Sequence, residues 1–85
     1  MKEKEILLLQ AVDSEDDYKL TCMSIDVNMT PTEDMVRQAI DFVYDPYKED
    51  QEEFENGIRS IIDFAECTEI RGYEFFWEKT KLYTE

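Results

Sequence analysis

Histidine is absent from this 85-residue sequence, and cysteine, proline and glycine occur only twice each. Without histidine the chain has no Ser-His-Asp triad, no Cys-His nucleophile pair and no zinc-finger spacing, so most nucleophilic catalysis is excluded. The two cysteines, Cys22 and Cys67, are far apart in the sequence. We expect two buried free thiols, with a disulfide as the alternative.

A long hydrophobic segment is also absent. The chain begins Met-Lys-Glu-Lys-Glu and continues with a short apolar run, which is neither a signal peptide nor a membrane span. The sequence therefore predicts a cytoplasmic protein in a reducing compartment. Eighty-five residues with 42% hydrophobic content suffice for one core without a metal or disulfide framework, so we expect a single compact domain over residues 1–85.

Positive charge is scarce, since 22 Asp and Glu residues stand against 9 Lys and Arg for a formal net charge of −13. This charge disfavours nucleic acid and anionic membranes as ligands, and it attracts basic proteins and speeds their encounter at low salt. Solubility alone is the competing explanation of the acidity. The expected partner is a basic protein, and the sequence leaves the oligomeric state open.

Three segments have the residue pattern of β-strands. The continuous apolar run over residues 6–12 predicts a strand covered on both faces. Residues 18–27 are rich in β-favouring residues and predict a second strand that returns antiparallel, so the two form a hairpin. Residues 73–83 are rich in aromatic residues and alternate in part, which favours a strand over a helix. Their aromatic side chains form either core or a recognition patch.

The first of two helical patterns begins at the clearest local signal in the chain. Thr30 is expected to be the N-cap, with Pro31 at the first helical position and Glu33 placed to return the capping bond. Apolar residues then recur at helical spacing until Asp45-Pro46, because proline disfavours helix in the residue before it. The predicted helix runs from Pro31 to Tyr44.

The second helical pattern runs from about Glu49 to Glu66 and has one apolar stripe. Gly57 weakens its interior by about 1 kcal/mol relative to alanine. The predicted order is therefore β-β-α-α-β. It describes a small α+β domain in which two helices lie on one face of an antiparallel sheet.

Acidic residues are concentrated in two places. The first is the junction between the predicted helices, where the acids are Asp45, Glu49, Asp50, Glu52, Glu53 and Glu55. Capping and solvation explain part of this run, but like charges at such spacing cost a few tenths of a kcal/mol per pair, which a basic partner would offset. The second is the predicted hairpin loop, with Asp13, Glu15, Asp16 and Asp17.

Other chemistry is conceivable for these carboxylates. The hairpin loop has the oxygen ligands of a calcium loop but not its required glycine or its final bidentate glutamate, so a solvated turn is the simpler interpretation and no metal site is predicted. A general acid-base pair of carboxylates needs a cleft that a domain of this size struggles to build. We therefore predict no catalytic residues and no cofactor.

The stretch Ala39-Ile40-Asp41-Phe42 is followed by Tyr47-Lys48-Glu49-Asp50-Gln51-Glu52-Glu53-Phe54-Glu55-Asn56. It resembles the helix-junction region of small acidic type II-A anti-CRISPR proteins, in which a tyrosine, a run of acids, a phenylalanine and an asparagine occur in the same order. That family is similar to this chain in size and charge. Its members inhibit an RNA-guided DNA endonuclease by mimicking the protospacer-adjacent (PAM) DNA duplex.

The resemblance implies that carboxylates occupy the arginines and lysines that otherwise hold DNA phosphates and read guanines. Glu49, Asp50, Glu52 and Glu53 would make these contacts. It also implies a phage-derived inhibitor in the cytoplasm of a bacterial host, with a CRISPR-associated nuclease or another basic DNA-binding protein as its partner. The alternative hypothesis is an acidic interaction module of another class, such as an immunity protein or a regulator that binds a basic partner.

Overall fold

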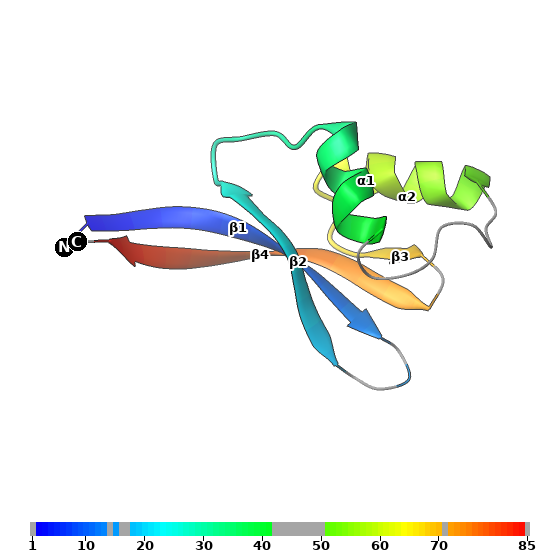
Figure 1. The fold of residues 1–85 in the computed structure, drawn as a ribbon, viewed down its shortest axis with the longest axis horizontal. Coiled ribbons are helices and arrows are strands. Elements are labelled where there is room, and N and C mark those ends of the chain that lie inside the picture. Colours follow the sequence, from blue (N-terminus) through cyan, green and yellow to red (C-terminus); the bar gives the residue numbers. More distant parts are fainter. Residues whose placement is uncertain (1, 14, 16–17, 42–50, 71, 85) are drawn as a thin grey trace.

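The structure, a computed structural model, describes residues 2–13, 15, 18–41, 51–70 and 72–84. The elements in chain order are β1 (Lys2–Asp13), β2 (Lys19–Asp26), α1 (Glu33–Asp41), α2 (Gln51–Ile62), β3 (Thr68–Ile70) and β4 (Tyr73–Thr84). The strands form one antiparallel sheet in the order β2-β1-β4-β3, and both helices lie on one of its faces (Figure 1). The predicted α+β class is confirmed, with β3 as an additional strand.

The centre of the sheet is the pair formed by β1 and β4, which joins the two ends of the chain. Their register runs from Lys2 opposite Thr84 to Asp13 opposite Tyr73. The register of β2 with β1 begins at Ile6, opposite Asp26, so residues 2–4 of β1 have no β2 partner in that register and the sheet narrows toward the termini. We call residues 2–8 of β1 and 78–84 of β4 the terminal arm, which projects away from the helices in Figure 1.

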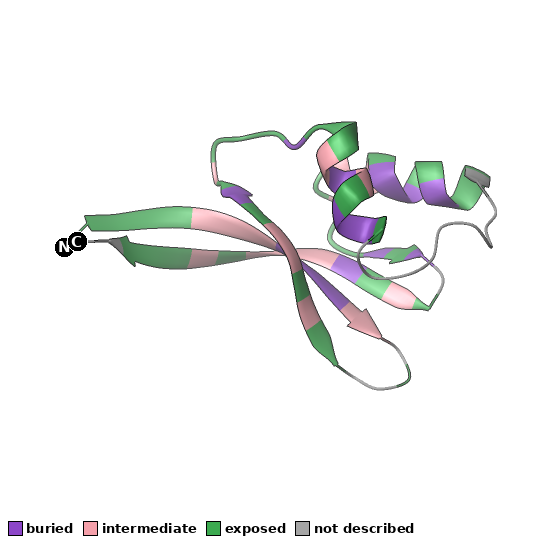
Figure 2. Cartoon of the chain, in the orientation of Figure 1, coloured by how far each residue is buried: buried purple, intermediate pink, exposed green. Residues whose placement is uncertain are grey.

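The hydrophobic core lies where the helices face the middle of the sheet (Figure 2). Leu9 of β1 and Phe75 of β4 are fully buried there beneath Ile40 of α1 and Ile58 and Ile61 of α2. Burying one such side chain contributes about 1.5–3 kcal/mol. The core therefore fixes the helices over the sheet.

One expectation about these strands needs correction. The run over residues 6–12 is covered by helices on one face only, so Leu8 and Val12 stay half-buried on the other face, and the strand extends to Lys2. The aromatic segment is divided between core and surface. Phe75 belongs to the core, whereas Tyr83 on the terminal arm is 61% exposed.

α1 begins two residues later than the sequence predicted. The Met35 N–H donates a hydrogen bond to Thr32 Oγ1 (3.2 Å), and the Val36 N–H donates to the Thr32 carbonyl (3.1 Å). Thr32 is therefore the N-cap instead of Thr30, and Pro31 is buried just before the helix. The predicted end of this helix at Tyr44 lies outside the described residues.

α2 ends four residues earlier than predicted because the chain makes a tight capping turn. The Phe64 N–H donates to the Ile61 carbonyl (3.0 Å) and the Ala65 N–H donates to the Ser60 carbonyl (3.1 Å), which is the Schellman pattern. Phe64 has a φ of 58°, where glycine is usual. The Trp77 indole N–H also donates to the Ile61 carbonyl (2.9 Å), and the Trp77 ring contacts that of Phe64, so β4 holds this turn in place.

Gly57 has a specific place in this packing. A Cβ at this position would lie 2.5 Å from Ile70 Cγ1, and closer still to Ile70 Cδ1. Because Ile70 is 1% exposed, its side chain has little room to move. Glycine therefore allows α2 to lie directly on β3, which the helix-propensity argument alone did not explain.

Candidate partner-binding surface

Charge is divided unequally between the two ends of the molecule. The terminal arm has four lysines and three glutamates, a net charge of +1. Because the whole chain has a net charge of −13, the remaining residues together have a net charge of −14. At the opposite end lie the start of α2, the β3–β4 turn and the β1–β2 turn (Figure 1). The described acids there are Asp13, Glu15, Glu52, Glu53, Glu55, Glu69 and Glu74. We call these residues the acidic end.

The carboxylates on and beside the terminal arm are neutralised by lysines. The ion pairs are Lys81–Glu3 (2.6 Å), Lys79–Glu5 (3.3 Å), Lys4–Asp26 (3.1 Å) and Lys19–Glu78 (2.8 Å). Exposed pairs of this kind contribute about 0–1 kcal/mol each. Their consequence here is local neutrality rather than stability.

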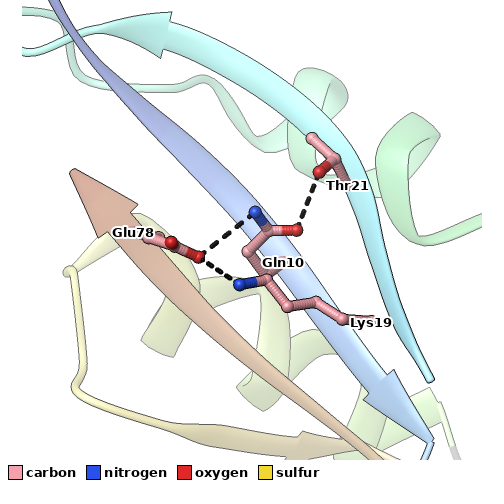
Figure 3. A network of polar contacts seen from close by, with 4 residues as sticks. All are labelled: Gln10, Lys19, Thr21 and Glu78. Carbon is pink, nitrogen blue, oxygen red and sulfur yellow. Dashed lines mark hydrogen bonds and ion pairs between the residues drawn. The ribbon is translucent and has the colours of Figure 1, made fainter. Parts of the chain in front are cut away.

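One of these pairs belongs to a polar network on the sheet face away from the helices (Figure 3). The Gln10 side chain is 3% exposed, and it donates to Glu78 Oε2 (3.3 Å) while accepting from Thr21 Oγ1 (2.8 Å). Lys19 reaches the same Glu78 oxygen. The hydrogen bond from Lys19, its charge and the bond from Gln10 together hold the pKa of Glu78 below its ordinary value. The network links β2, β1 and β4.

At the acidic end, the first turns of α2 present carboxylates to solvent. Phe54 is buried in the core, so Glu52, Glu53 and Glu55 on either side of it are exposed. Their place near the helix N-terminus is favoured by the helix dipole. Within the described part of the chain, neither Glu53 nor Glu55 has an ion pair or side-chain hydrogen bond.

One described cation beside the start of α2 is already engaged. Arg37 of α1 lies over the Phe54 ring (5.4 Å from its guanidinium carbon to the ring centroid). Its guanidinium pairs with Glu33 of the same helix (2.9 Å). It therefore anchors the start of α2 through Phe54 and is committed to Glu33 within α1.

A second group of carboxylates lies on the sheet itself. Glu69 of β3 and Glu74 of β4 are direct cross-strand partners and both are exposed. Like charges in this position destabilise a sheet. The pKa of the nearby Cys67 thiol is raised, first by desolvation and then by the negative charges of Glu74 and Glu69.

Both cysteines are free, as expected, but only one is shielded. Cys22 is half-buried against the core, and burial raises the pKa of its thiol to about 11. Cys67 is exposed, so the expectation that both are buried is wrong for this residue. It lies between α2 and β3, one residue before β3 begins.

Two of the four acids predicted in the β1–β2 turn, Asp13 and Glu15, lie within the described residues. Asp13 is half-buried and its Oδ1 accepts a hydrogen bond from the Glu15 N–H (2.9 Å), so this carboxylate stabilises the turn. Glu15 is exposed. The predicted site residues Asp16 and Asp17, together with Asp45, Glu49 and Asp50 at the helix junction, lie outside the described residues.

Strand register explains why these separate segments meet. Val12 lies opposite Glu74, which in turn lies opposite Glu69, so the β1–β2 turn and the β3–β4 turn lie at the same end of the sheet. Gly57 on Ile70 then brings the first half of α2 to that end. Sequence reasoning missed Glu69 and Glu74. The sequence signal for this turn was Gly72, which lies between β-favouring residues. In the structure Gly72 has a φ of 82°, as a turn glycine often does.

Hollows at the surface are small or open. The one between the helices, lined by Glu33, Glu55, Ile58, Arg59 and Ile62, has a volume of about 100 Å³, whereas ligand pockets are usually about 300–1,000 Å³. Among the residues placed by the structure, no three metal-ligating side chains are gathered into a possible ion site. No helix in the described ranges is long and apolar enough to cross a membrane.

Comparison with known proteins found no matching family model, no similar curated protein and no similar solved structure. The geometry and charge of the chain are therefore the basis for inferring its function.

Proposed function

We propose that this protein binds a basic protein partner through its acidic end, and that it acts as a DNA mimic that occupies the duplex-binding site of a DNA-binding enzyme such as a CRISPR nuclease. The observation that carries the proposal is that carboxylates at the two ends of the molecule differ in whether a lysine neutralises them. Those of the terminal arm each have a lysine partner, whereas Glu53, Glu55, Glu69 and Glu74 have none among the described side chains.

The cross-strand pair of Glu69 and Glu74 supports a role in binding. A sheet gains about 0.2–1 kcal/mol from a favourable cross-strand pair and loses stability from two like charges. On the terminal arm the chain places lysines beside its glutamates, which leaves the local charge balanced. An arginine or lysine of a partner would neutralise the repulsion between Glu69 and Glu74 and form charge-assisted hydrogen bonds of 1.5–3 kcal/mol as a typical order of magnitude.

DNA mimicry is favoured over simple solubility by the concentration of charge. Solubility requires only net charge, which an even distribution supplies equally well. A surface that competes with phosphates must instead gather several carboxylates in one part of the molecule. The acidic end does so, with Glu69 and Glu74 on the sheet face away from the helices and Glu53 and Glu55 on α2. The resemblance of the helix junction to anti-CRISPR proteins points to an RNA-guided endonuclease as the first enzyme to test.

Two variants of equal net charge test this surface. Glu69→Gln with Glu74→Gln changes the formal charge from −13 to −11, and so does Glu3→Gln with Glu5→Gln on the terminal arm. Binding to a purified, guide-loaded CRISPR nuclease is measured by surface plasmon resonance, with and without a PAM-containing duplex. We expect the first variant to bind about tenfold more weakly and the second to bind like the parent protein.

Two further readouts decide between the hypotheses. Binding should weaken steeply with added salt and should be displaced by duplex DNA. Simultaneous binding of this protein and the duplex, with no loss of either, would refute the mimicry. Equal losses in both variants would show that net charge, and not the acidic end, determines binding. DNA-independent binding to a basic toxin would instead support the immunity-protein alternative.

A further inference from the structure

β2 is an outer strand, with β1 on one side and no strand on the other in the portion that the structure describes. The backbone ladder to β1 continues one residue beyond each end of β2. The Asp13 N–H donates to the Tyr18 carbonyl (3.3 Å), and the Val27 N–H donates to the Glu5 carbonyl (3.4 Å). Residues 18–27 thus form an extended edge, and such an edge presents backbone donors and acceptors to another chain.

A β-bulge at Cys22 changes which side chains share a face of this strand. Leu9 lies opposite Met23 while Gln10 lies opposite Thr21, so Cys22 is the extra residue. Both Cys22 and Met23 pack against the core, on the helix side. Without the bulge, the strict alternation of a strand would place residues 19 and 26 on opposite faces. With it, Lys19 and Asp26 both lie on the face away from the helices.

The bulge makes the edge complementary to itself. In an antiparallel pair of two β2 strands centred between Cys22 and Met23, every residue opposes a residue on the same face of the second copy. The pairs are Tyr18–Val27, Lys19–Asp26, Leu20–Ile25, Thr21–Ser24 and Cys22–Met23. They match aromatic with β-branched, cation with anion, apolar with apolar, and hydroxyl with hydroxyl. Each of these combinations is a favourable cross-strand pair.

Open grooves and exposed apolar side chains accompany this edge. One groove of about 340 Å³ lies between β2 and α1 and is lined partly by Met23, Met35 and Ala39. Another of about 380 Å³ lies at the Asp26 end and is lined partly by Ile25, Met29, Met35 and Leu82. Tyr18 is 68% exposed, and in the paired register it opposes Val27, two residues from Met29 of the second copy.

Electrostatics select the antiparallel direction. The Lys19 end of β2 adjoins the acidic β1–β2 turn, and its Asp26 end adjoins the lysines of the terminal arm. Parallel pairing would bring two acidic ends together. Antiparallel pairing instead places the acidic end of each copy beside the terminal arm of the other, which has a net charge of +1 from its four lysines and three glutamates.

We propose that the β2 edge, residues 18–27, is the interface of a two-fold symmetric homodimer in which two β2 strands pair antiparallel with Lys19 opposite Asp26. The two sheets then form one continuous eight-stranded sheet, and the exposed edge of each copy is covered. This interface is separate from the acidic end, so it does not depend on the proposed function.

Disulfide trapping tests the register. Thr21→Cys and Ser24→Cys are prepared separately in a background in which Cys22 and Cys67 are both replaced by serine. Residues directly opposed in an antiparallel pair have Cα atoms about 4.5–5.5 Å apart, within disulfide range. Two copies of residue 21 lie three residues out of register, about 10 Å apart, which is too far. We expect a covalent dimer when the two variants are mixed and oxidised, and none from either variant alone.

A charge exchange tests the interface without covalent trapping. Sedimentation equilibrium should give twice the mass of one chain for the parent protein. Lys19→Asp or Asp26→Lys should each raise the dimer dissociation constant about tenfold, and the two combined should restore it. If the substitutions acted by damaging the fold, the double variant would dimerise more weakly than either single variant, because it loses the intramolecular ion pairs of both Lys19 and Asp26. Tyr18→Ser should also weaken the dimer, whereas Tyr83→Ser, at a similarly exposed tyrosine on the terminal arm, should not.

A single-chain mass for the parent protein at concentrations up to about 1 mM would overturn the proposal. So would a dimer that fails to form the mixed disulfide, or a double charge variant that dimerises no better than either single variant. A partner peptide or another protein on the β2 edge would be consistent only with those negative outcomes.

Discussion

Replacing Gly57 by alanine tests how tightly α2 is held against β3. In a solvent-exposed helix the change would stabilise the protein by about 1 kcal/mol, because alanine is the better helix former. Here the new Cβ would lie 2.5 Å from Ile70 Cγ1, within a core where Ile70 is 1% exposed. Overpacking of this kind costs about 1–3 kcal/mol. We therefore expect a net destabilisation of about 1 kcal/mol.

The measurement is urea unfolding followed by the fluorescence of Trp77, the single tryptophan, which packs against the core. The midpoint should fall with no change in the slope. Asn56→Ala, at the exposed neighbouring position of the same helix, supplies the control and should be stabilising by up to about 0.7 kcal/mol. If Gly57→Ala instead makes the protein about 1 kcal/mol more stable, as helix propensity alone predicts, the close approach of α2 to β3 is refuted.

A double-mutant cycle identifies the contact. Ile70→Val removes Cδ1, the atom that the new Cβ would approach most closely. Gly57→Ala should then cost about 1 kcal/mol less in the Ile70→Val background than in the parent protein. Additive effects of the two substitutions would mean that the strain arises elsewhere in α2.

Three further predictions concern single groups. Ellman's reagent should modify the exposed Cys67 before the half-buried Cys22. Glu69→Gln with Glu74→Gln should speed the reaction of Cys67 at pH 7, because removing both charges lowers the raised pKa of this thiol. The control, Glu3→Gln with Glu5→Gln, should leave the rate unchanged. In an NMR titration Glu78 should ionise below the ordinary range, and Lys19→Gln should raise its pKa. The pKa of Glu78 is lower in the folded protein than in the unfolded chain, so its ionised form stabilises the fold above the unfolded-state pKa, and this stability is lost as the pH falls through the folded-state pKa. Lys19→Gln should therefore reduce the loss of stability between these two pKa values. Trp77→Phe, followed by circular dichroism, should cost at least about 1 kcal/mol, because the hydrogen bond to Ile61 and the packing of the pyrrole part of the indole are lost while a six-membered ring remains.

The elements that sequence reasoning found are those with a strong local signal. β1, β2 and β4 were predicted from their apolar runs and β-favouring residues, and both helices from their apolar stripes. The shift of the first N-cap from Thr30 to Thr32 reflects two threonines that satisfy nearly the same local rule. β3 was missed because three residues are too few for a periodic pattern, and only pairing with β4 defines them.

The candidate site was predictable to a similar degree. Glu52, Glu53 and Glu55 were found because an acidic run beside a buried Phe54 must point outward. The pair of Glu69 and Glu74 was missed because it exists only in the register across the β3–β4 turn. The self-complementarity of β2 was equally hidden, since it depends on a bulge at Cys22 that reverses the side-chain alternation.

The separation of charge relates the two proposed surfaces to each other. Two chains of net charge −13 repel, so self-association is tolerable only where charge is locally balanced, and the lysines paired with Glu78 and Asp26 provide that balance at both ends of β2. The antiparallel pairing then directs the two acidic ends to opposite ends of the dimer. Each can meet a basic partner without approaching the other, so one dimer would present two equivalent partner sites. Substitutions at Lys19 or Asp26 should therefore change the number of partners held per assembly, and leave the affinity of each acidic end as it was.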